Sequence, residues 1–438
     1  MFKKTTFFLT ILLILLLIPT TASASELTAE GTCGQNVVWS LTEDGTLSIS
    51  GTGAMEDYSW TNFVPTTPWY QYRNSIKKII VHDGVTSIGS SAFYRLSSVT
   101  TIELSDDVLA LGSYAFASCS KIQSFHFPAN LVYIANYCFE DCYNLNNVAI
   151  PDTVTKLGDC VFTGCSNLEN VDLPENMQVL PRGFFSECTS LERITLPDSI
   201  TELVSYCFRD CTSLKYINFP SSITTIGYRA FSGCTSIEEI VLPNTITTLN
   251  SEVFYHCSGL KELTLSSNLG TIPKSLCYGC TSLEIVDIPV SVTKIEDFAF
   301  YGCSNLTSVI MHDGLQEIGK SAFFNCTNLV SMILPESIIK IGDNAYGCYK
   351  NIFDETDIVP NSKIYCFKST AAESYATKTG IPYSLIEIII DTFDCEYTGK
   401  PVTPSIIITI DGNSLNEGSD FLALYTNNTN IGTATVRI

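Results

Sequence analysis

The chain has 438 residues, with 45 acidic against 24 basic side chains and a formal net charge of −21. So acidic a surface repels phosphate backbones and anionic lipid headgroups, which argues against nucleic acid and anionic membranes as partners. At this length one compact core is not expected, but a repeat protein avoids that limit because it grows by adding units.

Residues 1–25 have the pattern of a secretory signal peptide. Lys3 and Lys4 precede an apolar run at 7–18, and Ala22 to Ala24 supply small residues at a cleavage point. The run is shorter than the roughly 18 residues that a spanning helix needs. We therefore expect an exported protein, secreted or held at the cell surface, with no transmembrane span in the mature chain.

Residues 26–75 are predicted to form an N-terminal β cap. Val37, Trp39 and Leu41 alternate with polar residues, Asp44-Gly45 is a tight-turn signal, and the alternation resumes after it. This pattern predicts a β-hairpin that covers the first repeat.

A period of 23 residues governs residues 76–349 and indicates a solenoid of about twelve coils. The phenylalanine column holds one residue per step and contains Phe93, Phe116, Phe139, Phe162, Phe185, Phe208, Phe231, Phe254, Cys277, Phe300, Phe323 and Tyr346. Three residues later, the cysteine column contains Cys119, Cys142, Cys165, Cys188, Cys211, Cys234, Cys257, Cys280, Cys303 and Cys326.

Residues 166–188 illustrate one coil. Val171 and Leu173 lie two apart, as on one face of a short strand, and Pro174 ends that strand because it lacks an amide hydrogen. Met177 and Leu180 are expected to point inward before Phe185 and Cys188 close the coil. Stacking such coils predicts a leucine-rich-repeat type of solenoid with one parallel β-sheet.

The repeat unit LPxxITxIGxxAFxGCxxLxxI resembles the leucine-rich repeat of the BspA-like surface proteins over residues 76 to about 349. GTCGQNVVWSLTEDGTLSISGTGAM, followed by Pro68-Trp69, resembles the segment that precedes the repeats in such proteins of Gram-positive bacteria. KIYCFKSTAAESYATKTGIPY (363–383) is similar to the segment that follows them. The resemblance implies attachment to host extracellular-matrix proteins, host cells or other microbes.

Two further segments follow the repeats. Residues 350–387 are predicted to form a C-terminal cap with a short helix, which Ser369 or Thr370 begins and Gly380 ends. Residues 388–438 resemble part of an immunoglobulin-like β module common on bacterial surfaces. They span about half a sandwich domain, so we expect an incomplete module or a fragment of a longer protein.

The cysteine column allows three interpretations. Each thiol is a small buried hydrophobe, or the thiols form disulfides, or they bind metal. Burial is favoured because parallel side chains point alongside rather than at each other. Pairs such as Cys138 with Cys142 and Cys207 with Cys211 remain open to oxidation, and only Cys277 with Cys280 has ligand-like spacing.

Residues for catalysis are not assembled by any pattern in the sequence. The four histidines are not paired at metal-ligand spacing, and neither a phosphate-binding glycine loop nor a nucleophile elbow is present. The sequence therefore predicts no enzyme, no metal site and no cofactor.

Binding is predicted at one of two surfaces. The solvent face of the sheet would present Asn170, Asp172, Arg193, Tyr216, Asn218, Glu239 and Glu262. The position after the phenylalanine column would give an aromatic row of Tyr255, Tyr278, Tyr301 and Phe324. Aromatic side chains favour protein and sugar contacts, although the rings could also only stack on one another, and the sheet face could be plain polar exterior.

The sequence as a whole predicts an adhesion or recognition protein that binds a host matrix or cell-surface protein or glycan. The alternative is a rigid spacer that presents a glycan-binding or enzymatic module missing from this chain. Saturable binding of a ligand to the solenoid alone would favour adhesion, and its absence would favour the spacer.

Overall fold

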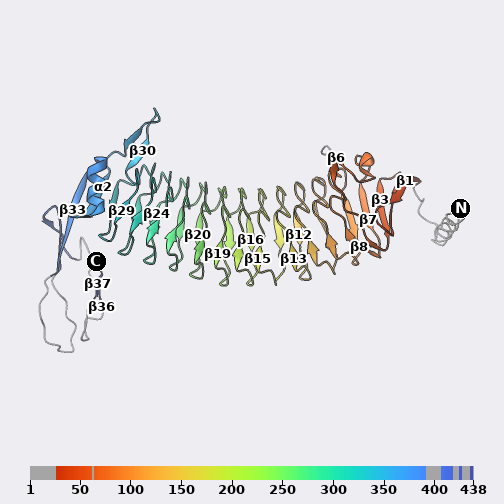
Figure 1. The fold of residues 1–438 in the computed structure, drawn as a ribbon, viewed down its shortest axis with the longest axis horizontal. Coiled ribbons are helices and arrows are strands. Elements are labelled where there is room, and N and C mark those ends of the chain that lie inside the picture. The colour runs from red at the N-terminus through yellow and green to blue at the C-terminus, as the bar shows by residue number, and fades with distance from the viewer. Residues whose placement is uncertain (1–25, 62–63, 391–405, 418–423, 427–434, 438) are drawn as a thin grey trace.

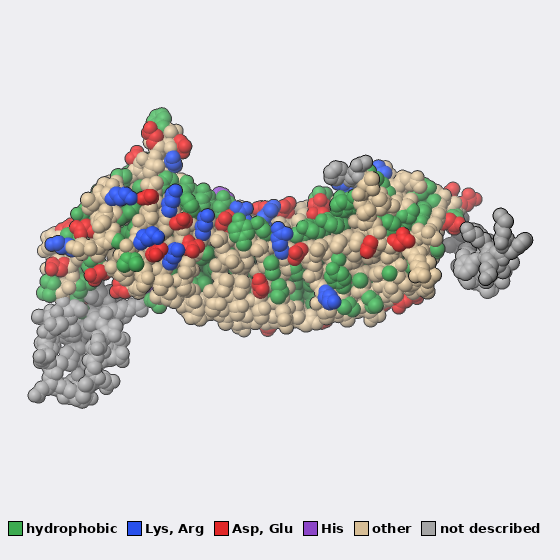
Figure 2. All heavy atoms as spheres, in the orientation of Figure 1, with side chains coloured by type: hydrophobic (Ala, Val, Ile, Leu, Met, Phe, Trp, Pro, Cys, Tyr) green, Lys and Arg blue, Asp and Glu red, His purple; other side chains and the backbone are tan. Residues whose placement is uncertain are grey.

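The computed structural model describes residues 26–61, 64–390, 406–417, 424–426 and 435–437. The predicted signal peptide lies outside these residues. Figure 1 shows an elongated, gently curved body in which successive coils stack side by side between an N-terminal and a C-terminal cap. Two short hairpins project from the same long edge, one at each end of the body (Figure 1, Figure 2).

The predicted parallel sheet is present as one short strand in nearly every coil. In the three-residue strands the middle residue faces the core, as Ile194 and Val286 do, and its two neighbours face solvent. At 124–126 the strand is reduced to a bridge between Ser124 and Asn147. The strands are β7 (Lys78–Val81), β9 (Thr101–Leu104), β12 (Asn147–Ala149), β14 (Asn170–Asp172), β16 (Arg193–Thr195), β18 (Tyr216–Asn218), β20 (Glu239–Val241), β22 (Glu262–Thr264), β24 (Ile285–Asp287), β26 (Ser308–Ile310) and β28 (Ser331–Ile333).

A second parallel ladder, which the sequence did not predict, runs beside the first. Its strands follow the proline turn, and most contain only two residues, such as β15, where Leu180 is buried and Val179 is exposed. The solenoid therefore has two parallel ladders instead of one sheet. The strands are β4 (Gly53–Ala54), β8 (Val85–Ile88), β10 (Ala110–Leu111), β11 (Tyr133–Ile134), β13 (Lys156–Leu157), β15 (Val179–Leu180), β17 (Glu202–Leu203), β19 (Thr225–Ile226), β21 (Thr248–Leu249), β23 (Thr271–Ile272), β25 (Lys294–Ile295), β27 (Glu317–Ile318) and β29 (Lys340–Ile341).

The turn around the phenylalanine column supplies a third set of coil-to-coil hydrogen bonds. The residues two before and two after the column are left-handed, with φ of 65° at Tyr206 and 57° at Asp210. This alternation turns every second amide toward the next coil, which offsets the roughly 1–2 kcal/mol that a left-handed residue costs. The bonds run from Tyr206 N to Tyr228 O (2.9 Å), from Phe208 N to Ala230 O (2.8 Å) and from Asp210 N to Ser232 O (2.7 Å).

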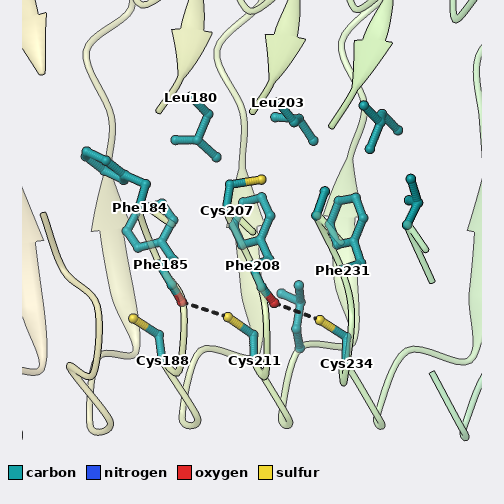
Figure 3. Close-up of a cluster of buried hydrophobic side chains, with 14 of the residues drawn as sticks. Leu180, Phe184, Phe185, Cys188, Leu203, Cys207, Phe208, Cys211, Phe231 and Cys234 are labelled. Carbon is teal, nitrogen blue, oxygen red and sulfur yellow. Dashed lines mark hydrogen bonds between the residues drawn. The ribbon is translucent and has the colours of Figure 1, made fainter. Parts of the chain in front are cut away.

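The phenylalanine column forms a stack through the centre of the core. Phe208 and Phe231 are fully buried, with ring centroids 5.4 Å apart and planes 6° apart (Figure 3). The stack begins at Trp69 of the N-terminal cap, which lies 5.8 Å from Phe93. Buried Leu180 and Leu203 lie in the same core. Because the contacts of each coil are with its neighbours, the stability of one coil depends on the next.

The N-terminal cap contains the predicted hairpin. Strands β2 (Val37–Thr42) and β3 (Thr46–Gly51) pair antiparallel, β1 (Leu27–Thr32) joins β2, and β3 pairs in parallel with β7 of the first coil. The cap also holds a 3-10 turn, η2 (Tyr70–Tyr72), and a small hairpin of β5 (Trp60–Thr61) and β6 (Val64–Pro65).

The C-terminal cap begins with a projecting hairpin of β30 (Cys348–Lys350) and β31 (Thr356–Ile358). Strand β32 (Lys363–Phe367) continues the ladder from β28, and helix α2 (Ala371–Thr379) follows. Its N-cap is Thr370, whose hydroxyl accepts the amide of Glu373, and left-handed Gly380 ends it, as predicted. Tyr375 of α2 packs on Tyr346 and closes the core.

The final strands extend this cap. Strand β33 (Tyr383–Ile390) pairs in parallel with β32 and antiparallel with β34 (Ile406–Ile410), which pairs with β35 (Asn413–Ser414). Strands β36 (Leu424–Thr426) and β37 (Thr435–Arg437) pair antiparallel. The predicted boundary at 388 lies within β33, and much of the predicted immunoglobulin-like module lies outside the described residues. Within the described chain, no helix has both the length and the apolar character needed to cross a bilayer.

Candidate functional site

The aromatic row predicted after the phenylalanine column is a stack of rings on the surface of the turn. The ring centroids of Tyr255 and Tyr278 are 4.9 Å apart, those of Tyr278 and Tyr301 are 4.5 Å apart, and Phe324 follows at 5.3 Å. The three tyrosines are half-buried. Phe324 is only 4% exposed, so it ends the row. The prediction that it offers binding surface was wrong.

An arginine extends this row toward the N-terminus. The Arg229 guanidinium lies 4.9 Å from the Tyr255 ring centroid and 5.3 Å from that of Tyr228, and it forms an ion pair with Glu252 at 2.6 Å. Tyr206 meets Tyr228 edge to face at 5.3 Å. Cation–π contacts of this kind link rings that do not stack on each other directly.

A second group of rings lies at the N-terminal end. Trp60 of the β5–β6 hairpin stacks on Tyr94 at 5.0 Å and meets Tyr114 edge to face at 5.0 Å. Tyr114 and Tyr137 then stack at 4.8 Å with planes 3° apart. Because Tyr94 occupies the repeat position of Tyr255, and Tyr114 that of Arg229, both groups lie along one edge of the solenoid. We call this set the aromatic edge: Trp60, Tyr94, Tyr114, Tyr137, Tyr206, Tyr228, Tyr255, Tyr278 and Tyr301.

Sequence reasoning found only part of the aromatic edge. Tyr114, Tyr137 and Tyr206 share the position two before the phenylalanine column, so a second tyrosine column was available as a signal. Tyr228 lies one residue outside that column, and Trp60 comes from the cap. Neither position is marked by the period.

Stacking determines which atoms of the aromatic edge meet solvent. With planes 6° apart at 4.5 Å, Tyr278 and Tyr301 cover each other's faces and leave ring edges and hydroxyls outside. Burial raises the pKa of the Tyr278 hydroxyl and also raises that of Tyr114, to about 12. These hydroxyls are therefore protonated at neutral pH and both donate and accept hydrogen bonds.

The second predicted surface, on the sheet, is also solvent-exposed. All seven predicted residues are exposed: Asn170, Asp172, Arg193, Tyr216, Asn218, Glu239 and Glu262. Two of them have structural partners, since Asn218 Oδ1 accepts the amide of Leu196 at 2.8 Å and Asn170 Nδ2 donates to Asn147 at 2.7 Å. Tyr216 is 66% exposed, with the Arg193 guanidinium 5.9 Å from its ring.

A shallow hollow of about 1030 Å³ lies on this sheet face. Tyr216, Glu239 and Glu262 line it together with Lys215 and Lys261. The lysines form ion pairs across neighbouring coils, Lys215 with Glu192 at 3.1 Å and Lys261 with Glu238 at 2.9 Å. The hollow is open and is lined by two lysines and three glutamates, so it lacks the enclosed apolar lining of a small-molecule site.

The cysteine column is buried and hydrogen-bonded. Each thiol donates to the carbonyl oxygen of the residue 26 positions earlier, as Cys211 does to Phe185 at 3.0 Å and Cys234 to Phe208 at 3.1 Å (Figure 3). Burial raises the pKa of Cys119 to about 12, so the thiol is the stable form. This geometry favours the structural interpretation over disulfides or metal.

Metal-ligand geometry is not found for the CxxC pair. Cys280 donates to the carbonyl of Phe254 at 3.1 Å, and Cys277 occupies the phenylalanine column in the core. Among the residues that the structure describes, no group of three or more His, Cys, Asp or Glu side chains is placed to hold a metal ion.

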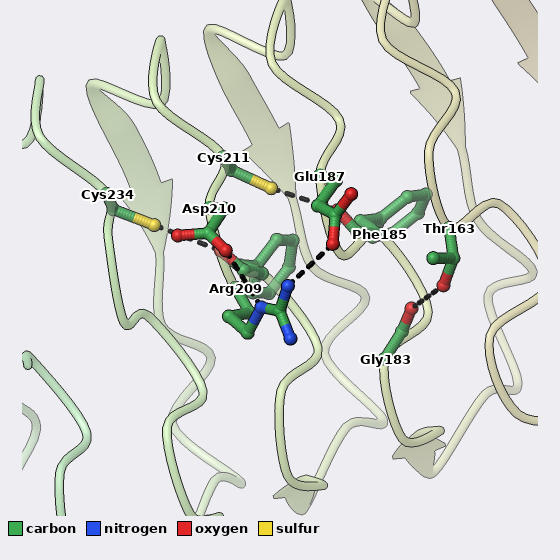
Figure 4. Close-up of polar contacts among 9 residues, drawn as sticks. Thr163, Gly183, Phe185, Glu187, Arg209, Asp210, Cys211 and Cys234 are labelled. Atoms are coloured by element: carbon green, nitrogen blue, oxygen red, sulfur yellow. Dashed lines mark hydrogen bonds and ion pairs between the residues drawn. The ribbon is translucent and has the colours of Figure 1, made fainter. Parts of the chain in front are cut away.

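Charged side chains on the same turn pair with one another. Arg209 bridges Glu187 of the preceding coil at 2.6 Å and Asp210 of its own coil at 2.8 Å (Figure 4). All three side chains are more than one-third exposed. Exposed ion pairs contribute little to the free energy of unfolding, so this cluster adds little to the stability of the fold.

Comparison with known proteins gives a family and a fold. The model described as the BspA type leucine-rich repeat region, of six copies, matches residues 68–192, 178–295 and 270–394. A leucine-rich repeat protein from Bacteroides ovatus is 27% identical, with a TM-score of 0.63 over 81% of this chain and 99% of its own. One from Eubacterium ventriosum is 26% identical, with a TM-score of 0.51 over 73% of this chain and 95% of its own.

No curated protein matches the chain. The family match, by contrast, spans the N-terminal cap boundary, every coil and the C-terminal helix. With its 23-residue coils, the chain belongs to the BspA-type leucine-rich repeat family.

Proposed function

We propose that this protein is an exported, non-catalytic recognition protein that binds a protein partner through the aromatic edge. The observation that carries the proposal is a set of rings in two groups outside the phenylalanine core, from Trp60 to Tyr137 and from Tyr206 to Tyr301. Trp60 is exposed and the tyrosines are half-buried. Tyrosine and tryptophan are enriched where binding energy concentrates in protein interfaces. A Gram-positive source and attachment to a host matrix or cell-surface protein are part of this proposal.

Ring geometry favours a protein over a glycan as the partner. A sugar stacks on the face of an aromatic ring, whereas neighbours cover the faces of Tyr278 and hold them at 4.5 and 4.9 Å. Hydroxyls and ring edges remain outside, and these suit backbone groups and apolar side chains of a protein. The ordered stack also lowers the side-chain entropy lost on binding.

The spacer function is the second candidate, and one observation favours it. Strand β33 belongs to the last sheet of the solenoid and also pairs with β34 through five residue pairs, from Ile386 with Ile410 to Ile390 with Ile406. Main-chain pairing of this extent makes a stiff junction. A module that follows the solenoid would then be held in a fixed direction.

Surface binding of the purified chain to a panel of matrix proteins and glycans tests the proposal. The key variant changes Tyr255, Tyr278 and Tyr301 to Ala, and the matched control changes Asn170, Tyr216 and Glu239 of the sheet face to Ala. Saturable protein binding that only the tyrosine variant loses, with its melting transition retained, supports the proposal. Binding lost only in the control would transfer the site to the sheet face, and no binding by folded wild type would favour the spacer.

A further inference from the structure

The hairpin β30–β31 exposes two large apolar side chains at its apex. Ile352 is 92% exposed and Phe353 is 75% exposed. Figure 2 shows hydrophobic side chains at the tip of this projection, with acidic side chains directly below them. Single exposed apolar residues are common on protein surfaces, but two adjacent ones at the apex of a projection are not explained by the packing of this fold.

The hairpin is anchored at its base by contacts that do not involve the side chains of the tip. Asn325 of the last regular coil holds the base. Its backbone N–H donates to the Cys348 carbonyl at 2.9 Å, and its side-chain Oδ1 accepts the backbone N–H of Lys350 at 2.8 Å. Cys348 is buried there. The exposed side chains of the tip therefore take no part in holding the hairpin to the solenoid.

The turn itself is preorganised. Asn351 Oδ1 accepts hydrogen bonds from the backbone N–H groups of Phe353 at 2.9 Å and Glu355 at 3.0 Å. The backbone N–H of Asn351 donates to the backbone carbonyl of Glu355 at 2.9 Å. Lys350 pairs with Asp354 at 3.4 Å. A tip fixed in this way loses little conformational freedom on binding, which is the usual route to higher affinity.

We infer that the hairpin tip inserts Ile352 and Phe353 into an apolar pocket of a protein partner whose rim is basic. The charge of the apex indicates which partner can bind there. Three acidic residues, Asp354, Glu355 and Asp357, lie near the tip with one basic residue, Lys350, so the apex is acidic. Anionic lipid surfaces and a second copy of this acidic chain both repel such an apex. The contact goes beyond the proposed function, because it uses neither the aromatic edge nor the sheet face.

A random peptide library displayed on phage, selected on the purified chain, tests the inference. Selected peptides are then measured against Phe353→Ser, against Ile352→Ser and against Ile339→Ser. Ile339 is 70% exposed on a different turn and is the matched apolar control. We expect the selected peptides to combine aromatic or aliphatic residues with Lys or Arg. Their affinity should fall about tenfold or more for either tip variant and stay unchanged for Ile339→Ser.

Salt and a charge variant test the basic rim. Binding of these peptides should weaken at high salt and with Asp354→Asn combined with Glu355→Gln, while all variants melt as wild type does. The inference is overturned if no selected peptide depends on the tip or if tip-dependent peptides lack basic residues. It is also overturned by tip-dependent binding to phosphatidylcholine or phosphatidylserine vesicles, or by tip-dependent self-association. The tyrosine variant of the aromatic edge should bind these peptides normally, which separates this test from that of the proposed function.

Discussion

The thiol of Cys211 donates a hydrogen bond to the carbonyl oxygen of Phe185 at 3.0 Å, and the same oxygen accepts the amide of Cys188 at 3.1 Å. Both acceptor positions of that carbonyl are therefore filled, one from its own coil and one from the next. Figure 4 shows the bond from Cys211. The column repeats this bond from coil to coil. Since a thiolate has no hydrogen to donate, the bond requires the protonated cysteine.

Alkaline pH should therefore destabilise the solenoid, and the decline should begin near pH 9, where ordinary tyrosines are still mostly protonated. Burial raises the pKa of Cys119 from 9.0 to about 12 and raises that of Cys188 well above 9.0. Above pH 9 the unfolded chain loses thiol protons that the folded chain keeps, so the unfolded state binds fewer protons and stability falls as pH rises. At pH 10 this costs about 1 kcal/mol per thiol. Melting temperatures measured between pH 7 and about pH 9.5 give this slope, because thiols of the unfolded chain ionise in that range and ordinary tyrosines mostly do not.

A column variant tests the assignment of this slope to the thiols. Changing Cys165, Cys188 and Cys211 to Ala lowers stability at every pH but should flatten the decline above pH 9. A decline as steep as in wild type would show that other groups cause it.

Core rings and edge rings should respond differently to truncation. Phe208→Ala opens a cavity between two stacked coils and should cost about 3–5 kcal/mol, because the ring is fully buried. Tyr278→Ala removes a half-buried ring and should cost clearly less. Urea unfolding of both variants makes the comparison. Equal losses would mean that the aromatic edge is chiefly a stabilising stack.

Much of the solenoid could be predicted because its apolar positions recur without insertion. The phenylalanine and cysteine columns, the proline turn and the helix caps at Thr370 and Gly380 each have a local physical cause that one sequence reveals. The second ladder could not be predicted, because a strand of two residues is too short to display an alternating pattern. Left-handed residues were equally hidden, since most of those positions are not glycine, as at Tyr206 and Asp210.

The candidate site was predicted only in outline. A column of tyrosines is visible in the sequence, but the contact of Arg229 with two rings depends on a side chain that reaches across coils. Burial of Phe324 was missed because its repeat position alone does not reveal that the C-terminal cap begins in the next coil. The apex of the β30–β31 hairpin lies in a segment where the period ends, so no column identified it.

The contact between helix α2 and the last coil should limit fraying at the C-terminus. The Tyr375 hydroxyl donates to Tyr346 O at 2.9 Å and accepts the Tyr346 amide at 3.0 Å, and both groups are buried. Tyr375→Phe leaves them unpaired, at about 1–3 kcal/mol for each group. Hydrogen exchange at the Tyr346 amide should accelerate. The control is Tyr383→Phe, an exposed ring of the same cap, which should leave that rate unchanged.

Asp210 and Gly233 should prove to be energetically coupled. Both lie two residues after the phenylalanine column, and a Cβ at Gly233 would come 2.1 Å from Asp210 Oδ1. Gly233→Ala therefore adds a clash to the roughly 1–2 kcal/mol cost of a left-handed alanine. Gly302→Ala is the matched control, with φ of 74° against 77° and its nearest neighbour atom 3.8 Å away, so it should carry the backbone cost alone. Adding Asp210→Gly to Gly233→Ala should remove the excess, and a double-mutant cycle measures that coupling. Equal costs for the two alanines would mean that the Asp210 carboxylate moves aside freely.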